Sequence, residues 1–340
     1  MAKCTVQLIL DRPDGLYSMG EKVTGKVQIL VDKDVSCKKL RLRREWRTSG
    51  RGNRASGGRV DMVLFTGEWR AGSEHTYPFE FDAPPGPVTQ QGKLINVHWS
   101  LEARADIPWA LDPKSERAFH LMPGPVSHVD LGPNYAPTTL DLSKMHGGGC
   151  LSLLGGISVG IGLALLLPTL FFLIDYGETL FDVQELVSAG FLLVGLLMLF
   201  FGIRNRLAAR KLGDFKVSLE PNIIRIGEPL VCSVVFTPRS SIRFNHVTAT
   251  VRGTEVAVSG SGKHQTTHSN KFFENRVALS GAVEVPGGKE TRLESILPLP
   301  ENGLSTFTAP ANTIAWEVVL HLDIHRWPDW KKNIPFTVVP

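Results

Sequence analysis

Short segments in which apolar and polar residues alternate occupy both ends of the chain. In the first part they lie at 6–10, 22–31, 39–46, 59–65, 75–81 and 98–105, and in the last part at 215–219, 230–236, 246–251, 271–279, 291–297 and 315–324. Gly, Pro, Asp and Asn cluster between the segments, and neither part contains a long stretch with the 3.6-residue period of an amphipathic helix. Regularly spaced short strands predict an all-β fold, with one β-sandwich in residues 1–124 and another in residues 214–340.

The two ends of the chain also resemble each other in sequence. Gly20 in a Gly-Glu pair corresponds to Gly227 at an offset of 207, and Trp99 corresponds to Trp316 at an offset of 217. The increase of ten predicts an insertion in the second copy, which we place in the polar stretch 259–270. The sequence therefore predicts a tandem duplication of one domain.

The first copy opens with a motif that is similar to one found in a known family. Residues 17–27, Tyr-Ser-Met-Gly-Glu-Lys-Val-Thr-Gly-Lys-Val, resemble the aromatic-x-x-Gly-Glu-x-Val-x-Gly-x-Val signature that opens arrestin-like domains. Residues 79–84 and 92–106 resemble later strands of that domain, and residues 253–255, Gly-Thr-Glu, resemble a strand end of the arrestin C-terminal domain. The resemblance implies two immunoglobulin-like β-sandwiches with a scaffold or adaptor role. The chain departs from arrestins in the long segment between its two domains.

Two runs without charged residues, 151–174 and 186–203, separate the predicted sandwiches. Because a bilayer core about 30 Å thick requires about 20 apolar helical residues, we predict a transmembrane helical hairpin over 148–204, after a Pro/Gly-rich linker at 125–147. The alternative is a pair of helices buried in a large core. The connecting loop carries acidic charges alone and basic residues flank the runs, which predicts both termini and both β-domains on the cytoplasmic side. The sequence thus predicts a two-pass integral protein of a plasma or inner membrane, with the lipid bilayer as a partner.

Small residues recur along both apolar runs. They are Gly156, Gly160, Ser188, Gly195 and Gly202. Such positions allow close helix packing, which predicts either a tight hairpin or a homo-oligomer formed between copies of the chain. The alternative is that glycine is simply common in membrane helices. Cys150, at the edge of the first run, is a candidate for palmitoylation, the alternative being an unmodified cysteine.

A basic run in the first domain is the strongest charge feature of the chain. Besides two lysines it contains Arg41, Arg43, Arg44, Arg47, Arg51, Arg54 and Arg59, with Glu45 as its one acidic residue. We predict that these arginines contact anionic lipid headgroups or a partner protein through a strand face and the glycine-rich loop after it. The alternative is a solvated strand face. The net charge of only +4 and the absence of a nucleic-acid-binding motif argue against a nucleic-acid partner.

No arrangement of residues in the sequence indicates catalysis or metal binding. The four cysteines form no Cys-x-x-Cys pair, which predicts reduced thiols and no zinc ribbon. His264 and His268 lie four apart, as do His321 and His325, but in loop and strand segments where that spacing does not bring two ligands together. The glycine-rich stretch near residue 260 lacks the frame of a phosphate-binding loop. We therefore predict a protein that is not an enzyme and that has no cofactor and no metal; an enzyme with a site assembled from several loops is the alternative.

These features lead to one main prediction of function and one alternative. The main prediction is a membrane-anchored arrestin-like scaffold or adaptor, whose two cytoplasmic β-sandwiches bind a protein partner. The alternative is a structural protein of the membrane surface that binds anionic lipid headgroups through the basic run. The sequence does not indicate which protein the partner is.

Overall fold

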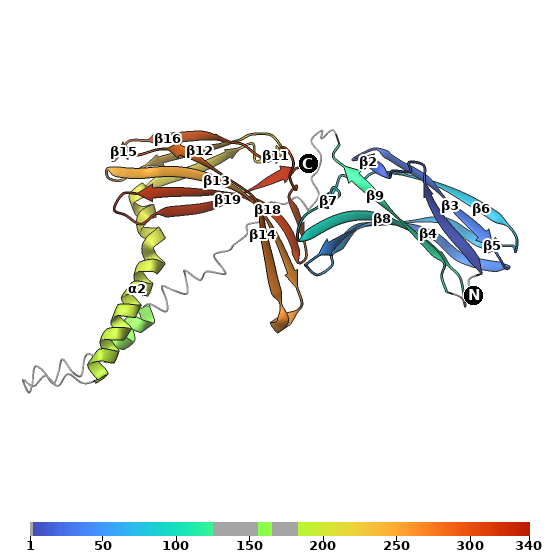
Figure 1. The fold of residues 1–340 in the computed structure, drawn as a ribbon, viewed down its shortest axis with the longest axis horizontal. Coiled ribbons are helices and arrows are strands. Elements are labelled where there is room, and N and C mark those ends of the chain that lie inside the picture. Colours follow the sequence, from blue (N-terminus) through green and yellow to red (C-terminus); the bar gives the residue numbers. More distant parts are fainter. Residues whose placement is uncertain (1–2, 110, 125–155, 165–182) are drawn as a thin grey trace, which may run out of the picture.

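The computed structural model describes residues 3–109, 111–124, 156–164 and 183–340. They form two β-sandwiches side by side, and helix α2 (Val183–Leu212) leads into the second sandwich (Figure 1). The strands of the first sandwich are β1 (Cys4–Leu10), β2 (Leu16–Ser18), β3 (Lys22–Val31), β4 (Val35–Gly50), β5 (Ser56–Trp69), β6 (Glu74–Asp82), β7 (Gln90–Gln91), β8 (Ile95–Asp106) and β9 (Lys114–Met122). The strands of the second are β10 (Asp214–Glu220), β11 (Ile223–Arg225), β12 (Leu230–Thr237), β13 (Ile242–Ser259), β14 (Thr266–Ser280), β15 (Val283–Val285), β16 (Thr291–Leu297), β17 (Phe307–Ala309), β18 (Asn312–Ile324) and β19 (Trp330–Val339), with a 3-10 turn at Gly262–His264.

Each sandwich consists of a three-stranded sheet and a larger sheet, and the strand order is the same in the two sandwiches. The first pairs β1-β3-β6 with a sheet of order β2-β9-β8-β4-β5, in which β7 also pairs with β8. The second pairs β10-β12-β16 with a sheet of order β11-β19-β18-β13-β14, in which β17 pairs with β18 and β15 with β13. The all-β, two-sandwich part of the predicted fold is therefore confirmed, and the identical strand order agrees with the predicted duplication.

The cores form where the predicted alternation places apolar side chains on the inner face of each sheet. In β3, for example, Val23, Val27 and Ile29 are fully buried, while Thr24, Lys26 and Gln28 on the other face are partly exposed. The equivalent residues Trp99 and Trp316 are also buried, one in each core. Burial of large aromatic side chains supplies much of the stabilisation of such a core.

The insertion in the second copy is distributed over two places. The offset between equivalent strands is 207 at the starts of β4 and β13, 211 at the ends of β5 and β14, and 217 at the starts of β6 and β16. Part of the insertion thus lies in the β13–β14 hairpin, where the sequence predicts it. The larger part lies in the connection from β14 to β16, which holds the additional strand β15.

The structure corrects the predicted transmembrane hairpin. Across residues 3–109, 111–124, 156–164 and 183–340, no helix is long and apolar enough to cross a membrane. The apolar run 186–203 is not a separate element, because α2 continues from it through a basic segment to Leu212, which is buried in the core of the second sandwich. The predicted two-pass localisation in a plasma or inner membrane is therefore wrong. Of the first predicted span the structure describes the helical residues 156–164, and the predicted linker and Cys150 lie outside the described residues.

Candidate functional site

The two sandwiches meet through an interface that is partly apolar. Phe307 and Ile314 of the second sandwich belong to the same buried cluster as Trp46 of the first. The rings of Trp46 and Phe307 meet edge to face, with their centroids 5.5 Å apart. Because such contacts remove apolar surface from water and add a favourable ring geometry, they stabilise one arrangement of the two sandwiches.

A fully buried carboxylate, that of Glu255 in β13, is the centre of the polar part of the interface. Its oxygens accept hydrogen bonds from the backbone N–H groups of Lys93, Leu94 and Ile95, at 3.2, 3.0 and 3.1 Å. The side-chain amide of Asn270 donates a fourth hydrogen bond at 2.9 Å. Four donors offset much of the cost of removing a charged group from water, since hydrogen bonds to a carboxylate are stronger than those between neutral groups.

The turn that carries these N–H groups approaches Glu255 very closely. A Cβ atom at Gly92 would lie 2.0 Å from the Oε1 atom of Glu255, well inside van der Waals contact. Glycine is therefore required at this position by the close approach of the turn to the carboxylate, not by an unusual backbone angle.

A second polar contact joins the tip of the β4–β5 hairpin to the second sandwich. The amide nitrogen of Asn312 donates to the backbone oxygen of Asn53 at 2.7 Å and to Thr48 Oγ1 at 3.3 Å. Asn53 and Gly260 exchange two hydrogen bonds, at 2.8 and 3.1 Å, and the N–H of Asn53 donates to the oxygen of Val258 at 2.8 Å. The glycine-rich loop of the basic run is thus a docking element between the sandwiches.

The duplication relates the two polar contacts to each other. Thr48 and Glu255 occupy equivalent positions at the offset of 207, and Ile95 and Asn312 are equivalent at the offset of 217. Glu255 contacts Ile95, and Asn312 contacts Thr48. Equivalent pairs of strand positions therefore face each other across the interface, so that both sandwiches contribute the same two elements.

Three arginines of the basic run converge on one carboxylate at the edge of the first sandwich. The Nε atom of Arg43 donates to Asp61 at 2.8 Å, Arg59 lies 3.3 Å from the same carboxylate, and Arg41 lies 3.7 Å from it. The hydrogen bond from Arg43 is the largest cause that holds the pKa of Asp61 below its usual range, although burial opposes it. Asp61 therefore stays ionised, and the cluster retains an excess of positive charge.

The remaining arginines of the run have other surroundings. Arg47 is paired with Glu45 and, at 3.0 Å, with Glu116. Arg44 lies over the rings of Phe81 and Trp99 and donates to the backbone oxygen of Asp82 at 2.9 Å; burial lowers its pKa. Arg51 and Arg54 are exposed on either side of the docked Asn53. The run does not form one continuous cationic face, and its contact with lipid headgroups or with a partner stays a prediction.

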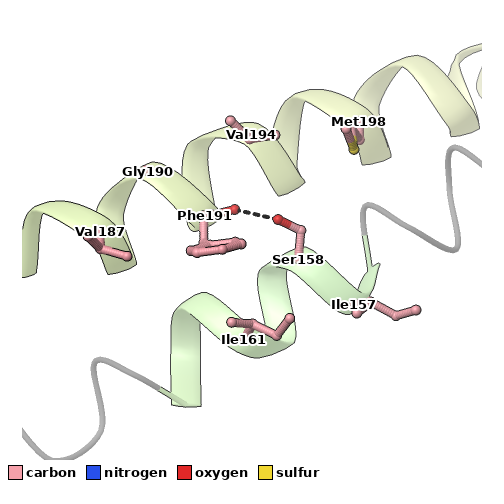
Figure 2. A pocket seen from close by; sticks show the side chains of 8 residues that line it. All are labelled: Ile157, Ser158, Ile161, Val187, Gly190, Phe191, Val194 and Met198. Atoms are coloured by element: carbon pink, nitrogen blue, oxygen red, sulfur yellow. Dashed lines mark hydrogen bonds between the residues drawn. The ribbon is translucent and has the colours of Figure 1, made fainter. Parts of the chain in front are cut away.

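An apolar groove lies between the helical residues 156–164 and α2. It has a volume of about 550 Å³ and is lined by Ile157, Ser158, Ile161, Val187, Gly190, Phe191, Val194 and Met198 (Figure 2). The hydroxyl of Ser158 donates to the backbone oxygen of Phe191 at 3.0 Å. This hydrogen bond links the two helical segments across the groove (Figure 2).

The predicted helix-packing residues do not all lie at the contact between these helices. A Cβ atom at Gly156 or at Gly160 would meet nothing within 4 Å, whereas one at Gly162 would lie 2.8 Å from the side chain of Leu192. Ser188 and Gly195 are buried, and the surroundings of Gly202 lie outside the described part of the chain. The close approach of the two helices is therefore made at Gly162, which the spacing of small residues did not single out.

The described residues contain no cluster of three or more His, Cys, Asp or Glu side chains that could hold a metal ion. Cys4, Cys37 and Cys232 are free and buried, and burial raises the pKa of their thiols, in Cys37 and Cys232 to about 11. A thiol that stays protonated is a poor nucleophile. These cysteines are therefore core residues.

The sequence did not indicate the roles of Glu255, Asn312 and Asn53 at the interface. Glu255 and Asn312 are polar residues within strand segments whose other inward positions are apolar, and both are buried. Buried polar residues of this kind are rare unless they have partners. The signal in the sequence was thus an interruption of the apolar pattern, but it could not indicate which partner satisfied it.

Comparisons with known proteins found a similar solved structure but no matching family. No family model matches the chain, and no curated protein matches it. Among solved structures the chain is similar to Spo0M, a sporulation control protein from Bacillus subtilis, over 98% of this chain and 91% of that one, with 12% sequence identity and a TM-score of 0.32. The two-sandwich fold described above follows from the strand pairing of this chain, and its place in the arrestin-like family stays a prediction.

Proposed function

We propose that the chain is a non-enzymatic adaptor, in which two β-sandwiches held in one fixed arrangement bind a partner protein. The observation that supports this most directly is the buried Glu255, which three hydrogen bonds join to the turn before β8 in the other sandwich. A fixed arrangement of two domains places surfaces from both at set distances, which is useful for recognising a large partner. The resemblance of residues 17–27 to arrestin-like domains also favours a scaffold role.

The proposal is tested by covalent capture with the full chain. A photoreactive phenylalanine analogue replaces Val63 on β5 in one variant and Arg276 on β14 in another, and crosslinked proteins are identified by mass spectrometry. We expect one and the same partner to be captured from both sandwiches. The variant G92A, in which the new methyl group collides with Glu255, should lose this double capture while each sandwich stays folded.

The matched control is G281A, because a Cβ atom at Gly281 meets nothing within 4 Å. This variant should capture the partner as the unchanged protein does. Equal capture by G92A and G281A would show that the arrangement of the sandwiches is irrelevant, and the proposed adaptor function would then be wrong. Circular dichroism of both variants confirms that the β-sandwiches remain folded.

A further inference from the structure

One half of strand β5 has an unpaired edge. β5 is the last strand of its sheet and pairs with β4 alone among the described strands. Near its end, Phe65 stacks on Trp69 and contacts Tyr77 of β6, with ring centroids 5.2 Å apart in both pairs, which closes the sandwich there. Residues 59–64 have no such cover. They form a free edge of six residues, which is the usual length of a strand.

The two faces of this free edge differ in chemistry. In the β4–β5 register Asp61 lies opposite Arg43, and Val63 lies opposite Arg41. The side chains of Asp61 and Val63 are therefore on the outer face, together with the arginine cluster. Val60 lies on the opposite face. Val60 and Val63 are 49% and 53% exposed, which is unusual for valine in a strand.

The charge at this edge is not balanced. Arg41, Arg43 and Arg59 share Asp61 as their ion-pair partner. Glu102, opposite Arg43 on β8, lies 3.5 Å from Lys114. Arg41 also acts on Asp112, whose pKa it helps to lower, whereas Asp61 is the one ion-pair partner of Arg43 and Arg59 among the described residues. The free edge at Arg43 and Arg59 therefore carries more positive than negative charge.

The duplicated strand β14 provides an internal comparison. It is also the last strand of its sheet, but there Arg252 and Lys271 are matched by Glu274 and Glu317. These two cations are thus paired with two carboxylates. On β5, in contrast, three arginines share one carboxylate.

We propose that residues 59–64 of β5 bind an extended segment of a partner protein, which adds as a further strand and places acidic side chains on the arginine face and an apolar side chain against Val60. A free strand edge supplies backbone hydrogen bonds to an added strand, and alternate side chains supply the specificity. The negative charge that would complement the cluster is then provided by the partner. This inference rests on the proposed function, since it takes the ligand of the adaptor to be a protein segment.

The test uses the full chain and two fluorescein-labelled decapeptides of alternating sequence, Glu-Val and Lys-Val. Fluorescence anisotropy should show tighter binding of the Glu-Val peptide, and the binding should weaken as the ionic strength rises from about 0.05 M to about 0.3 M, because salt screens exposed charges. R59S should weaken binding about 2- to 5-fold, as expected for one exposed ion pair. K271S on β14 is the matched control and should leave the affinity unchanged.

Hydrogen exchange measures the added strand directly. The Glu-Val peptide should protect backbone amides of residues 59–64, and V63E, which adds a negative charge to the edge, should remove this protection while V63Q retains it. Equal affinity for the two peptides, or unchanged binding by R59S, would overturn the proposal. Arginine-dependent binding of phosphatidylserine vesicles that the peptide does not displace would also overturn it, in favour of a lipid headgroup. If the peptide fails while the double capture of a partner persists, the adaptor function stands and β5 is not its binding edge.

Discussion

Glu255 has no exposed surface, and four N–H donors surround its carboxylate. The two carboxylate oxygens therefore accept hydrogen bonds from both sides of the interface, from the turn before β8 and from Asn270. The free energy that this arrangement contributes depends on the carboxylate being intact, because a buried polar group that loses its partner costs more than the hydrogen bond itself. At the scale of single residues, this group and Glu317 give the clearest tests.

The first prediction is that E255Q lowers the free energy of unfolding by about 1–3 kcal/mol, the cost of leaving buried donors unmatched. The amide has one oxygen, so its NH₂ group must face an N–H donor of the turn or of Asn270. Urea denaturation of the full chain measures the change. E294Q serves as the control, because Glu294 is exposed on β16 and pairs only with Arg292 in the described region; a loss as large in E294Q would contradict the prediction.

The second prediction concerns the pH dependence of stability through Glu317. Burial raises the pKa of this carboxyl above its usual range, although Arg252 and Asn333 act in the opposite direction. A group whose pKa is raised by folding stabilises the folded state below the unfolded pKa, and this contribution is lost as the pH rises through the folded pKa. E317Q should therefore be relatively more stable at pH 7 than at pH 4 when compared with the unchanged protein. Thermal melts across this range measure it, and parallel pH profiles of the two proteins would contradict it.

At the scale of secondary-structure elements, the alternation located most of the longer strands, but not β9 or β19, and it missed the short ones. The alternation at 39–46 predicted a strand of eight residues, whereas β4 is 16 residues long and continues to Gly50. The sequence of its last residues shows no alternation of apolar and polar residues. They are nevertheless part of the strand, because they pair with β8 and because Thr48 contacts Asn312 of the second sandwich. The strands β2, β7 and β17 are two or three residues long, and so short a segment contains no period to detect. The arginine cluster is likewise only partly visible in the sequence. The arginines form a run there, but the pairing of β4 with β5 is needed to see that Arg41, Arg43 and Arg59 meet at Asp61.

The third prediction tests how β5 is held against its own sandwich. Gly57 lies directly against Trp46, since a Cβ atom there would be 2.5 Å from Cζ2 of the indole ring. G57A should therefore shift the start of β5 and destabilise the chain by about 1–3 kcal/mol, the usual cost of overpacking. Urea denaturation and the fluorescence of the buried tryptophans measure the effect. G281A again is the control, and equal stability of the two variants would show that β5 moves without cost.

At the scale of the whole molecule, the interface makes one unit of two domains that are each large enough to fold separately. Trp46, Phe307 and Ile314 belong to one buried cluster, and the polar contacts of Glu255 and Asn312 flank it. The repeat is visible in the sequence but this coupling is not, because contacts between residues more than 150 positions apart leave no local pattern. Two equivalent surfaces that face each other also mean that a change on either side weakens the same interface.

The fourth prediction follows from this coupling. The unchanged chain should unfold in a single calorimetric transition, because each sandwich covers apolar surface of the other and opening the interface exposes both. G92A forces the turn before β8 away from the Glu255 carboxylate and leaves a buried charge short of donors, so the two sandwiches should unfold in separate transitions, the earlier one at a lower temperature. Differential scanning calorimetry of the full chain measures this, with G281A expected to retain the single transition. Two transitions in the unchanged protein, or one in G92A at an unaltered temperature, would mean that the carboxylate contact does not couple the sandwiches. The arrangement that the adaptor function requires would then have to depend on the apolar contact of Trp46 with Phe307 and on the hydrogen bonds of Asn53 and Asn312.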